Sequence, residues 1–530
     1  MNVRFYFSAT TLARVLLPYI IDRGPSYGKD LTPGLREPDN PDAGRKKIVV
    51  EFSSPNLGKE FDGSHLRSTI IGAYIASLYE EMGWDVVRMN FLGDWGMHIG
   101  LLAVGWSRFG SEEDFQADPL RHLLDVYAQI EKLFKPEQEA AKKLRNEHQD
   151  SSAIESEGIS GERNVFFRKM EDGDPDALAL WKRFREVCIP KYTDLYARLN
   201  IKFDDYSGES DVSNETVAEV EAILTEKGVY EEIDGAWALD FKKCGSGGLG
   251  SSILRYRSGT TSYLLRDICA VLERSRKYSF DKMIYVVSAK QNQHFAQIFK
   301  ALELMGHSDL VEKLEHVSFG KVQGLSAKEG SSGLLLGDIL DQCQSAISRL
   351  LEVDPANTQE FQGGDRLRVS DALGGISLMA QDLSTRRGGN FQFDIAKMAT
   401  TEGWTGIALE ESYAKLSTKL NGAAIDRHEL ESTDYSLFEE KQAYTDVLRL
   451  LAQFPGIVKS SLKPLESSTI LALLYRIVDS LQLVWDEEAE DGSLQAGGSQ
   501  QVLAQLAFYQ SVRQVLENGM RMVGLVPMTT

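Results

Sequence analysis

Residues 51–68 read Glu-Phe-Ser-Ser-Pro-Asn-Leu-Gly-Lys-Glu-Phe-Asp-Gly-Ser-His-Leu-Arg-Ser, and this stretch decides the fold. It overlaps the apolar run at 46–52, which is typical of a buried strand, and it leads into a segment with helical spacing of apolar residues at 64–83. Residues 85–91 then predict a second strand. A strand, a helix and another strand in this order predict a β-α-β unit within a parallel, doubly wound sheet.

A second unit of this kind lies at residues 262–305, and a long insertion separates it from the first. Within the insertion, which we place at about 110–260, helical patterns occupy 118–147 and 175–199. A polar stretch rich in Ser, Glu and Gly at 150–163 predicts a mobile loop.

The last part of the chain has a different pattern. From about residue 335 onward it is almost purely helical, with long amphipathic repeats at 439–456, 465–487 and 498–523. The predicted fold class is therefore an α/β domain with a Rossmann-like sheet and insertions, followed by an all-α domain.

The composition argues against several classes of protein. The chain has 530 residues, which predicts more than one domain, and its net charge of −20 argues against a generic DNA- or RNA-binding protein. No segment approaches ~20 uninterrupted apolar residues and no secretion signal is evident, so we expect a cytoplasmic protein without a membrane span. The four cysteines lie far apart without a Cys-x-x-Cys pair, so we expect buried thiols and no metal site.

A set of polar residues falls at the edge of the predicted sheet where open α/β sheets bind their ligands. Its members are Glu51 and Asn56 after the first strand, Tyr263 and Asp267 on one face of a helix, and Gln291 after a later strand. Carboxylates and other acceptors in such a set are what a planar guanidinium cation requires. Each residue alone also has a structural explanation, and Asp267 has an alternative in an ion pair with Arg266 or Arg274.

Several stretches of the chain resemble one known family. The run Thr-Thr-Ser-Tyr-Leu-Leu-Arg-Asp at 260–267 is similar to Thr-Thr-Leu-Tyr-x-Thr-Arg-Asp of the arginyl-tRNA synthetases. The end of 51–68 resembles their Pro-Phe-His-x-Gly-His-Leu-Arg-Ser, and residues 90–96 and 517–525 resemble further landmarks. The resemblance runs from about residue 4 to the C-terminus.

This resemblance implies a class I synthetase catalytic domain followed by a helical, anticodon-binding-like domain. It implies limits of 46–330 for the catalytic domain, 331–530 for the helical domain and 1–45 for a remnant of an N-terminal tRNA-binding domain. It also places five residues on the positions that bind arginine in the family, namely Glu51, Asn56, Tyr263, Asp267 and Gln291.

The sequence departs from the family at the motif that begins the first helix and handles ATP. Where the family has His-x-Gly-His, Asp62 replaces the first histidine, Ser64 replaces the glycine, and His65 remains. A carboxylate ~4 Å from a phosphate costs about 4 kcal/mol at an effective dielectric near 20, so the departure is expected to slow activation by ATP.

Two further landmarks have changed. The mobile catalytic loop reads Gly-Leu-Ser-Ala-Lys-Glu-Gly at 324–330, with Lys328 in place of an arginine and Glu329 in place of a lysine. The family's Thr-Gly-Pro-Tyr-Leu-Gln-Tyr-Ala-His run reads Thr-Gly-Ile-Ala-Leu-Glu-Glu-Ser-Tyr at 405–413, which argues against ordinary anticodon recognition.

A complete arginine pocket beside an altered nucleotide centre favours a protein that uses arginine already activated as arginyl-tRNA. In this respect the chain resembles the fungal arginine-containing cyclodipeptide synthases derived from the family. That resemblance implies an enzyme of secondary metabolism that joins arginine to a second amino acid, taken from a second aminoacyl-tRNA, as a diketopiperazine without ATP. The alternatives are an ATP-dependent arginine–tRNA ligase and a non-catalytic arginine-binding paralogue.

The catalytic roles expected for this reaction fall on the altered motifs. Asp62 or His65 is expected to be the general base on an α-amine, which must be neutral to attack an ester. Ser64 is expected either to carry an aminoacyl group or to cap the helix. Lys328 is the loop cation expected to approach the phosphates, and His294 is either catalytic or a hydrogen-bonded structural histidine.

Overall fold

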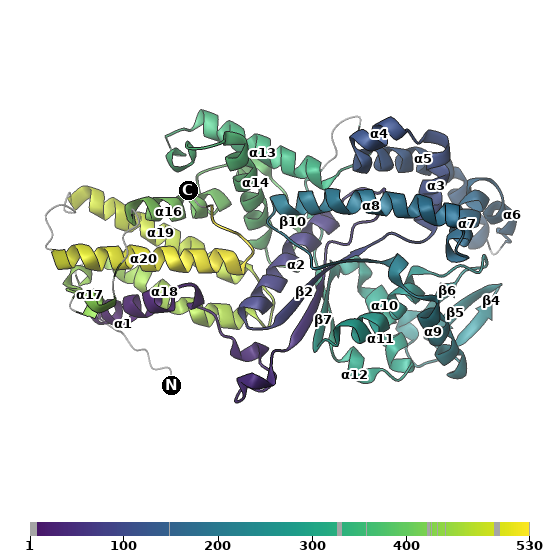
Figure 1. Cartoon of the computed structure of the whole chain (residues 1–530), viewed down its shortest axis with the longest axis horizontal. Coiled ribbons are helices and arrows are strands. Elements are labelled where there is room, and N and C mark those ends of the chain that lie inside the picture. Colours follow the sequence, from purple (N-terminus) through teal and green to yellow (C-terminus); the bar gives the residue numbers. More distant parts are fainter. Residues whose placement is uncertain are drawn as a thin grey trace.

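The chain folds into an α/β domain joined to a bundle of helices, which lie at opposite ends of its long axis (Figure 1). The computed structural model describes residues 8–147, 149–325, 331–356, 358–420, 425, 427–431, 433–439, 441–491 and 499–528.

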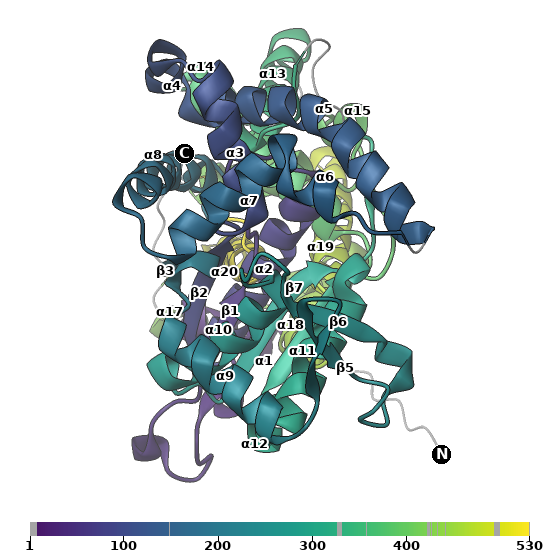
Figure 2. The same ribbon diagram turned by 90° about the vertical axis from the view of Figure 1, so that its right-hand side faces the viewer.

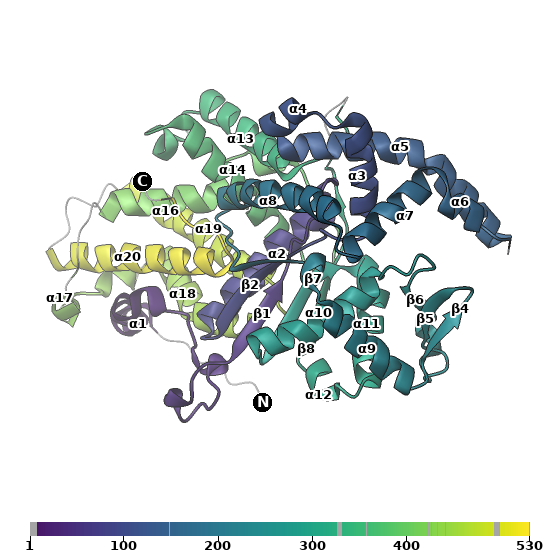
Figure 3. The ribbon, with the colours of Figure 1, turned by 45° about the vertical axis from the view of Figure 1, so that its right-hand side comes forward.

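The central sheet has five parallel strands in the order β3-β2-β1-β7-β8, and Figure 3 labels β2, β1, β7 and β8. The strands span Asp205–Gly208 (β3), Asp85–Leu92 (β2), Lys47–Glu51 (β1), Lys282–Ser288 (β7) and Leu314–Phe319 (β8). Strand β1 lies between β2 and β7, and the strand order reverses there. The carboxyl ends of these three strands therefore meet at the position where sheets of this kind bind ligands.

Each face of β1 packs into a separate core because successive side chains of a strand point to opposite faces. Ile48 and Val50 belong to the core that contains helix α2, whereas Val49 belongs to the core that contains α10. Burial on both faces explains why this strand is a continuous apolar run in the sequence. The helices of this region are α2 (Gly63–Glu81), α10 (Tyr263–Tyr278), α11 (Asn292–Leu304) and α12 (Ser308–Val311).

A helical insertion lies between β2 and β3, and a small antiparallel sheet, β4-β5-β6, follows β3 (Figure 2). The insertion consists of α3 (Met97–Phe109), α4 (Glu112–Ala117), α5 (Pro119–Asn146), α6 (Ser152–Ser156), α7 (Gly158–Glu171) and α8 (Pro175–Arg198). After β3 come α9 (Asn214–Glu226), β4 (Tyr230–Ile233), β5 (Ala236–Asp240) and β6 (Ser251–Arg255). Strand β3 lies within 110–260 but pairs with β2, so the chain rejoins the main sheet there.

The prediction of a mobile loop at 150–163 is wrong, because most of this stretch forms helices α6 and α7. The start of α7 is capped from a distance by Glu137 of α5. Its carboxylate accepts hydrogen bonds from the backbone N–H groups of Ile159 at 3.1 Å and Ser160 at 2.9 Å. A cap supplied by another helix leaves no mark in the local sequence, so the polar composition alone predicted a loop.

The bundle consists of long helices that follow the central sheet in the sequence. They are α13 (Leu336–Val353), α14 (Arg366–Leu383), α16 (Gly406–Leu420), α18 (Gln442–Ser461), α19 (Ser468–Asp491) and α20 (Ser499–Met522), with the shorter α15 (Ile395–Met398) and α17 (Arg427–Glu431) between them. Helix α1 (Ala9–Arg23) packs against α18 and α20 (Figure 1). The predicted fold class, an α/β domain followed by a helical domain, is confirmed.

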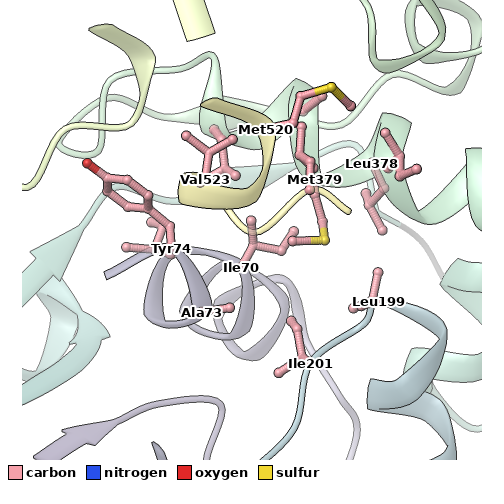
Figure 4. Packing of buried hydrophobic residues seen from close by; sticks show 14 of the residues in the cluster. Ile70, Ala73, Tyr74, Leu199, Ile201, Leu378, Met379, Met520 and Val523 are labelled. Atoms are coloured by element: carbon pink, nitrogen blue, oxygen red, sulfur yellow. The ribbon is translucent and has the colours of Figure 1, made fainter. Parts of the chain in front are cut away.

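Helix α2 packs against both domains. On the bundle side, Ile70 and Tyr74 lie close to Met379 of α14 and to Met520 of α20 and the adjoining Val523 (Figure 4). All five residues are buried, and α2 contacts both α14 and α20 as well as the sheet. The α2 side of the sheet and the bundle therefore share one continuous core, and a movement of α2 would disturb both domains.

One segment of the described chain, Ser468–Ala489 in α19, is long and apolar enough to cross a membrane by length and composition alone. It packs against α16, α18 and α20, and Leu471 and Leu474 on it are fully buried. These contacts are those of a core helix of the bundle.

Candidate functional site

A cavity of about 500 Å³ lies at the carboxyl edge of the sheet, and we call it the ligand cavity. All five side chains predicted to bind arginine line it: Glu51, Asn56, Tyr263, Asp267 and Gln291. These residues come from segments more than 200 positions apart in the sequence, and the parallel sheet brings them together. A cavity of this size accommodates a small polar molecule such as an amino acid.

Glu51 is held at the base of the ligand cavity by a buried ion pair with Arg274. Its Oε2 lies 2.5 Å from Nη1 of Arg274, and both side chains are 6% exposed. Burial raises the pKa of Glu51 to about 7, while Arg274 acts in the opposite direction and Asp267 adds to the rise. The other oxygen, Oε1, accepts no hydrogen bond from the described residues and is free for a ligand.

Asp267 pairs with His294 and not with either arginine of its own helix. Its Oδ2 lies 2.6 Å from Nε2 of His294. Arg266 instead pairs with Glu171 at 3.1 Å, and Arg274 pairs with Glu51 as described. His294 therefore holds one oxygen of Asp267 and leaves the other to the cavity, which gives this histidine a positioning contact within the site.

The two carboxylates share one arrangement, in which a basic side chain of the protein binds one oxygen and the second oxygen is left to the cavity. The remaining predicted residues lie around them. Tyr263 is the first residue of α10, is 57% exposed, and has its ring 5.0 Å from that of His294. Gln291 lies in the 3-10 turn Ala289–Gln291 that follows β7. Such a set of acceptors suits the several N–H groups of a guanidinium.

The backbone that follows β1 is strained and held in place by hydroxyl groups. Ser53 has a φ of +73°, in the left-handed region that costs a residue other than glycine ~1–3 kcal/mol. The hydroxyl of Ser68 in α2 accepts a hydrogen bond from the N–H of Ser53 at 2.9 Å and donates one to the carbonyl of Val286 at 2.6 Å. The turn brings Asn56 against Gly93, where a Cβ would lie only 2.1 Å from the Asn56 Oδ1.

Two charged residues of the ligand cavity, Glu209 and Lys59, were missed by the sequence reasoning. Burial raises the pKa of Glu209 well above its ordinary value, and the nearby charges of Asp267 and Asp94 add to the rise. Burial lowers the pKa of Lys59, which has no ion-pair partner among the described residues. Glu209 directly follows β3 at the ligand edge, a signal that was hidden because β3 lies inside the region assigned to the insertion.

Asp94 connects the end of β2 to the turn that carries Glu209. Its buried carboxylate accepts a hydrogen bond from Nε of Arg185 at 2.7 Å. It also accepts from Ser210, at 3.0 Å from the backbone N and 2.7 Å from Oγ. The run at 90–96, which resembles a landmark of the family, therefore has a structural role. Its Asp94 binds Ser210 and so fixes the position of the adjacent Glu209.

Asp62, and not Ser64, is the N-cap of α2. Its Oδ1 accepts hydrogen bonds from the N–H groups of Ser64 at 2.8 Å and His65 at 3.1 Å, and Nδ1 of His65 lies 3.1 Å from the Asp62 backbone N. Burial acts to raise the pKa of Asp62, but the hydrogen bonds from His65 and from the backbone outweigh it and lower the pKa to about 2. A carboxylate with so low a pKa is a weak base near neutral pH, so His65 is the better candidate for a general base.

The residues of the altered motif lie apart from the ligand cavity. Asp62, Ser64 and His65 are not among the residues that line it. The start of α2 instead faces the segment that follows β8, where a Cβ on Gly63 would lie 2.6 Å from the Cβ of Val322. Lys328 and Glu329 fall outside the described residues, so their roles stay predictions.

Comparisons with known proteins support this description. Residues 36–395 match the family "tRNA synthetases class I (R), catalytic domain", and residues 409–530 match the "DALR anticodon binding domain". The chain is 38% identical over 528 residues to the cytoplasmic arginine–tRNA ligase of Saccharomyces cerevisiae, and the alignment covers 99% of this chain and 81% of the relative. It is 37% identical over 484 residues to the mitochondrial arginine–tRNA ligase of that yeast, and this alignment covers 91% of this chain and 72% of the relative. The solved arginyl-tRNA synthetase of Thermus thermophilus has the same fold, with a TM-score of 0.71 at 17% identity over 97% of this chain and 85% of that chain.

These relatives contradict the reaction predicted from the altered motifs. Proteins that align with 91% or 99% of the chain are named arginine–tRNA ligases, so the prediction of cyclodipeptide synthesis, with its second aminoacyl-tRNA and its place in secondary metabolism, is wrong. The structure supplies a physical reason. Two backbone N–H groups donate hydrogen bonds to Asp62 and offset part of its charge, so its presence alone does not exclude nucleotide chemistry. The chain belongs to the class I arginyl-tRNA synthetase family.

Proposed function

We propose that the chain is an arginine–tRNA ligase, which activates arginine with ATP and transfers it to tRNA. The observation that carries the proposal is the ligand cavity, where Glu51, Asp267 and Glu209 present three carboxylates to one small space. Carboxylates that repel one another are stabilised by a cation placed between them, and a guanidinium is such a cation. The names of the relatives support the same activity.

Within the ligand cavity, the free oxygens of Glu51 and Asp267 accept hydrogen bonds from the guanidinium of arginine. Asn56, Tyr263 and Gln291 orient the remainder of the amino acid. Lys59 lines the cavity without an ion-pair partner among the described residues, which suits it to the α-carboxylate or to a phosphate of ATP.

The phosphates of ATP bind near the N-terminus of α2, where the helix dipole favours anions. His65 lies there, and Lys328 is the further cation that the sequence predicts for these phosphates. The tRNA binds through the helical domain and presents its acceptor end to the ligand cavity, in keeping with the match of residues 409–530 to an anticodon-binding domain. We place the protein in the cytoplasm, as the name of the cytoplasmic yeast relative suggests.

One observation favours a second candidate, an arginine-binding paralogue without catalytic activity. Asp62 already accepts hydrogen bonds from the first N–H groups of α2, which are the groups that a phosphate would use. A nucleotide must displace this carboxylate or bind beside it, at an electrostatic cost.

Arginine-dependent exchange of labelled pyrophosphate into ATP, followed by charging of tRNA with labelled arginine, distinguishes the two candidates. The ligase shows both activities with the purified full-length chain. The non-catalytic paralogue binds arginine in a calorimeter and shows neither. Binding of lysine or citrulline as tightly as arginine would contradict both candidates, because neither ligand offers the forked cation that the cavity fits.

A further inference from the structure

Arg67 is fully buried where three distant segments of the chain meet. From α2, its Nε donates to Oδ1 of Asp382 in α14 at 3.0 Å. Its Nη1 donates to the carbonyl oxygens of Gly320 at 3.0 Å and Gly389 at 2.5 Å, and its Nη2 donates to that of Arg386 at 3.3 Å. Only a planar guanidinium supplies donors in the directions that these four acceptors require.

Two of the segments that Arg67 joins are also paired with each other. We call residues 320–325 the loop stem, because they connect β8 to residues 326–330, and we call residues 386–393 the linker. In the loop stem, β9 (Val322–Gln323) runs parallel to β10 (Phe391–Gln392) of the linker. The N–H of Gly320 donates to the carbonyl of Arg387 at 3.0 Å. The loop stem and the linker therefore form one small unit that Arg67 attaches to α2.

At Gly320 and at Gly63, the fit between this unit and its neighbours leaves no space for an extra methyl group. A Cβ on Gly320 would lie 2.3 Å from the carbonyl oxygen of Gly389, and a Cβ on Gly63 would lie 2.6 Å from the Cβ of Val322. The second contact places the loop stem directly against the start of α2. By contrast, a Cβ on Gly388 would meet no atom within 4 Å.

The linker is also attached to the helical domain. The backbone N–H of Arg387 donates to Oε2 of Glu466, between α18 and α19, at 3.1 Å. The side chain of Arg387 donates to the carbonyl of Ser318 at the end of β8. Contacts thus run from the helical domain through the linker to the loop stem, and Arg67 fixes them to the helix that carries the motif at 62–65.

We propose that Arg67 is a positioning residue, which sets the loop stem against the N-terminus of α2 and so controls the rate of arginine activation. Arg67 does not line the ligand cavity, so the binding of arginine is independent of it. This inference rests on the proposed ligase function. In the sequence, the loop stem is followed by Lys328, the cation predicted to approach the phosphates, and a displacement of about 1 Å in a catalytic group costs about 100-fold in rate.

The paired variants Gly320→Ala and Gly388→Ala test the proposal without removing a buried charge. Gly320→Ala is expected to lower kcat for pyrophosphate exchange by about 100-fold and to leave KM for arginine within about twofold. Gly388→Ala makes the same chemical change within the linker and is expected to match the wild type. An unchanged kcat in Gly320→Ala, or a KM for arginine that rises as much as kcat falls, would overturn the proposal.

A second measurement separates failure of this proposal from failure of the ligase proposal. If the wild type shows no exchange activity, the proposed function fails, and hydrogen exchange of backbone amides still reports on Arg67. Arg67→Lys keeps the charge but loses the fork, and it is expected to speed exchange at Gly320, Phe391 and Phe393 by at least about tenfold. The control Arg198→Lys weakens the ion pair of α8 with Asp371 of α14, at 2.6 Å, and is expected to leave these amides protected. Equal protection in both variants would show that Arg67 does not position the loop stem.

Discussion

Nη1 of Arg274 lies 2.5 Å from Oε2 of Glu51 beneath the ligand cavity, and both side chains are almost entirely buried. The family resemblance predicted Glu51 as a direct ligand of arginine, and the ion pair shows that only one of its oxygens remains for that purpose. Removing one partner of a buried pair leaves an uncompensated charge at a cost of ~3–5 kcal/mol. Arg274 therefore controls whether Glu51 is charged when arginine arrives.

This ion pair predicts a defined pH dependence of arginine binding. Glu51 must be ionised to accept a guanidinium, and its pKa is about 7, so binding to the wild type should strengthen as the pH rises through 7 and level off above it. In Arg274→Gln the pKa rises further, so the midpoint should move up by at least about one pH unit. Calorimetric titration of arginine between about pH 6 and about pH 9 measures both midpoints.

Arg276→Gln is the matched control, because Arg276 lies two residues further along α10 and pairs with Glu219 at the exposed surface. It should bind arginine as the wild type does at every pH. Coincident midpoints for the wild type and Arg274→Gln would show that the charge of Glu51 does not limit binding.

Glu209 predicts selectivity for a cation over a neutral analogue of the same shape. Citrulline has nearly the shape of arginine but no charge, and Glu209 adds a carboxylate to a cavity that already holds Asp267. Glu209→Gln should weaken arginine binding about tenfold and change citrulline binding by less than about twofold. The exposed Glu215→Gln, on α9, should alter neither affinity. Equal losses for both ligands would indicate a role of Glu209 in shape and not in charge.

Two variants of Asp62 are expected to separate its role as the cap of α2 from its effect on nucleotide binding. Asp62→Asn keeps an oxygen to accept the N–H groups of Ser64 and His65 but removes the negative charge, so KM for ATP in the exchange assay should fall about tenfold. Asp62→Ala removes the cap as well and should lower the free energy of unfolding by about 1 kcal/mol. If KM for ATP does not fall in Asp62→Asn, the carboxylate lies too far from the phosphates to repel them.

A buried carboxyl group in the helical domain predicts pH-dependent stability. Glu410 is 1% exposed, its Oε2 accepts the N–H of Met528 at 3.1 Å, and its Oε1 has no hydrogen-bond partner among the described residues. Burial raises its pKa to about 7, above the ordinary value, so its contribution to stability is complete at low pH and is lost as the pH rises through 7.

Glu410→Gln should therefore gain stability relative to the wild type as the pH increases. Between about pH 4.5 and about pH 8, the difference in the free energy of unfolding should change by about 3 kcal/mol in favour of the variant. Urea unfolding followed by circular dichroism at both pH values measures it, and Glu402→Gln on the surface should show no such change. A constant difference would mean that water or a cation reaches Glu410.

The sheet and its ligand edge were predictable because they depend on local patterns. The apolar run of β1 and the helical spacing of α2 are properties of neighbouring residues, and their order fixes a parallel arrangement. Once the arrangement is fixed, Glu51 and Gln291 must lie at the same edge, since each follows the carboxyl end of a strand.

The partners of these residues were not predictable, because they depend on side-chain geometry across segments. The sequence offered Arg266 and Arg274 on the same helix as partners of Asp267, yet Asp267 pairs with His294 on α11. The cap of α7 comes from Glu137 on a different helix. The wrong reaction was predicted from the charge of Asp62, because the sequence does not show which N–H groups donate hydrogen bonds to a carboxylate.

Ser68 and Arg67 are adjacent on α2 but serve different neighbours. The hydroxyl of Ser68 fixes the strained turn at Ser53, beside the ligand cavity, whereas the guanidinium of Arg67 reaches the seam between the two domains. One helix therefore carries two separate attachments, one to the turn beside the ligand cavity and one to the helical domain. A chimera that takes its helical domain from a bacterial relative should keep its choice of amino acid and activate that amino acid more slowly.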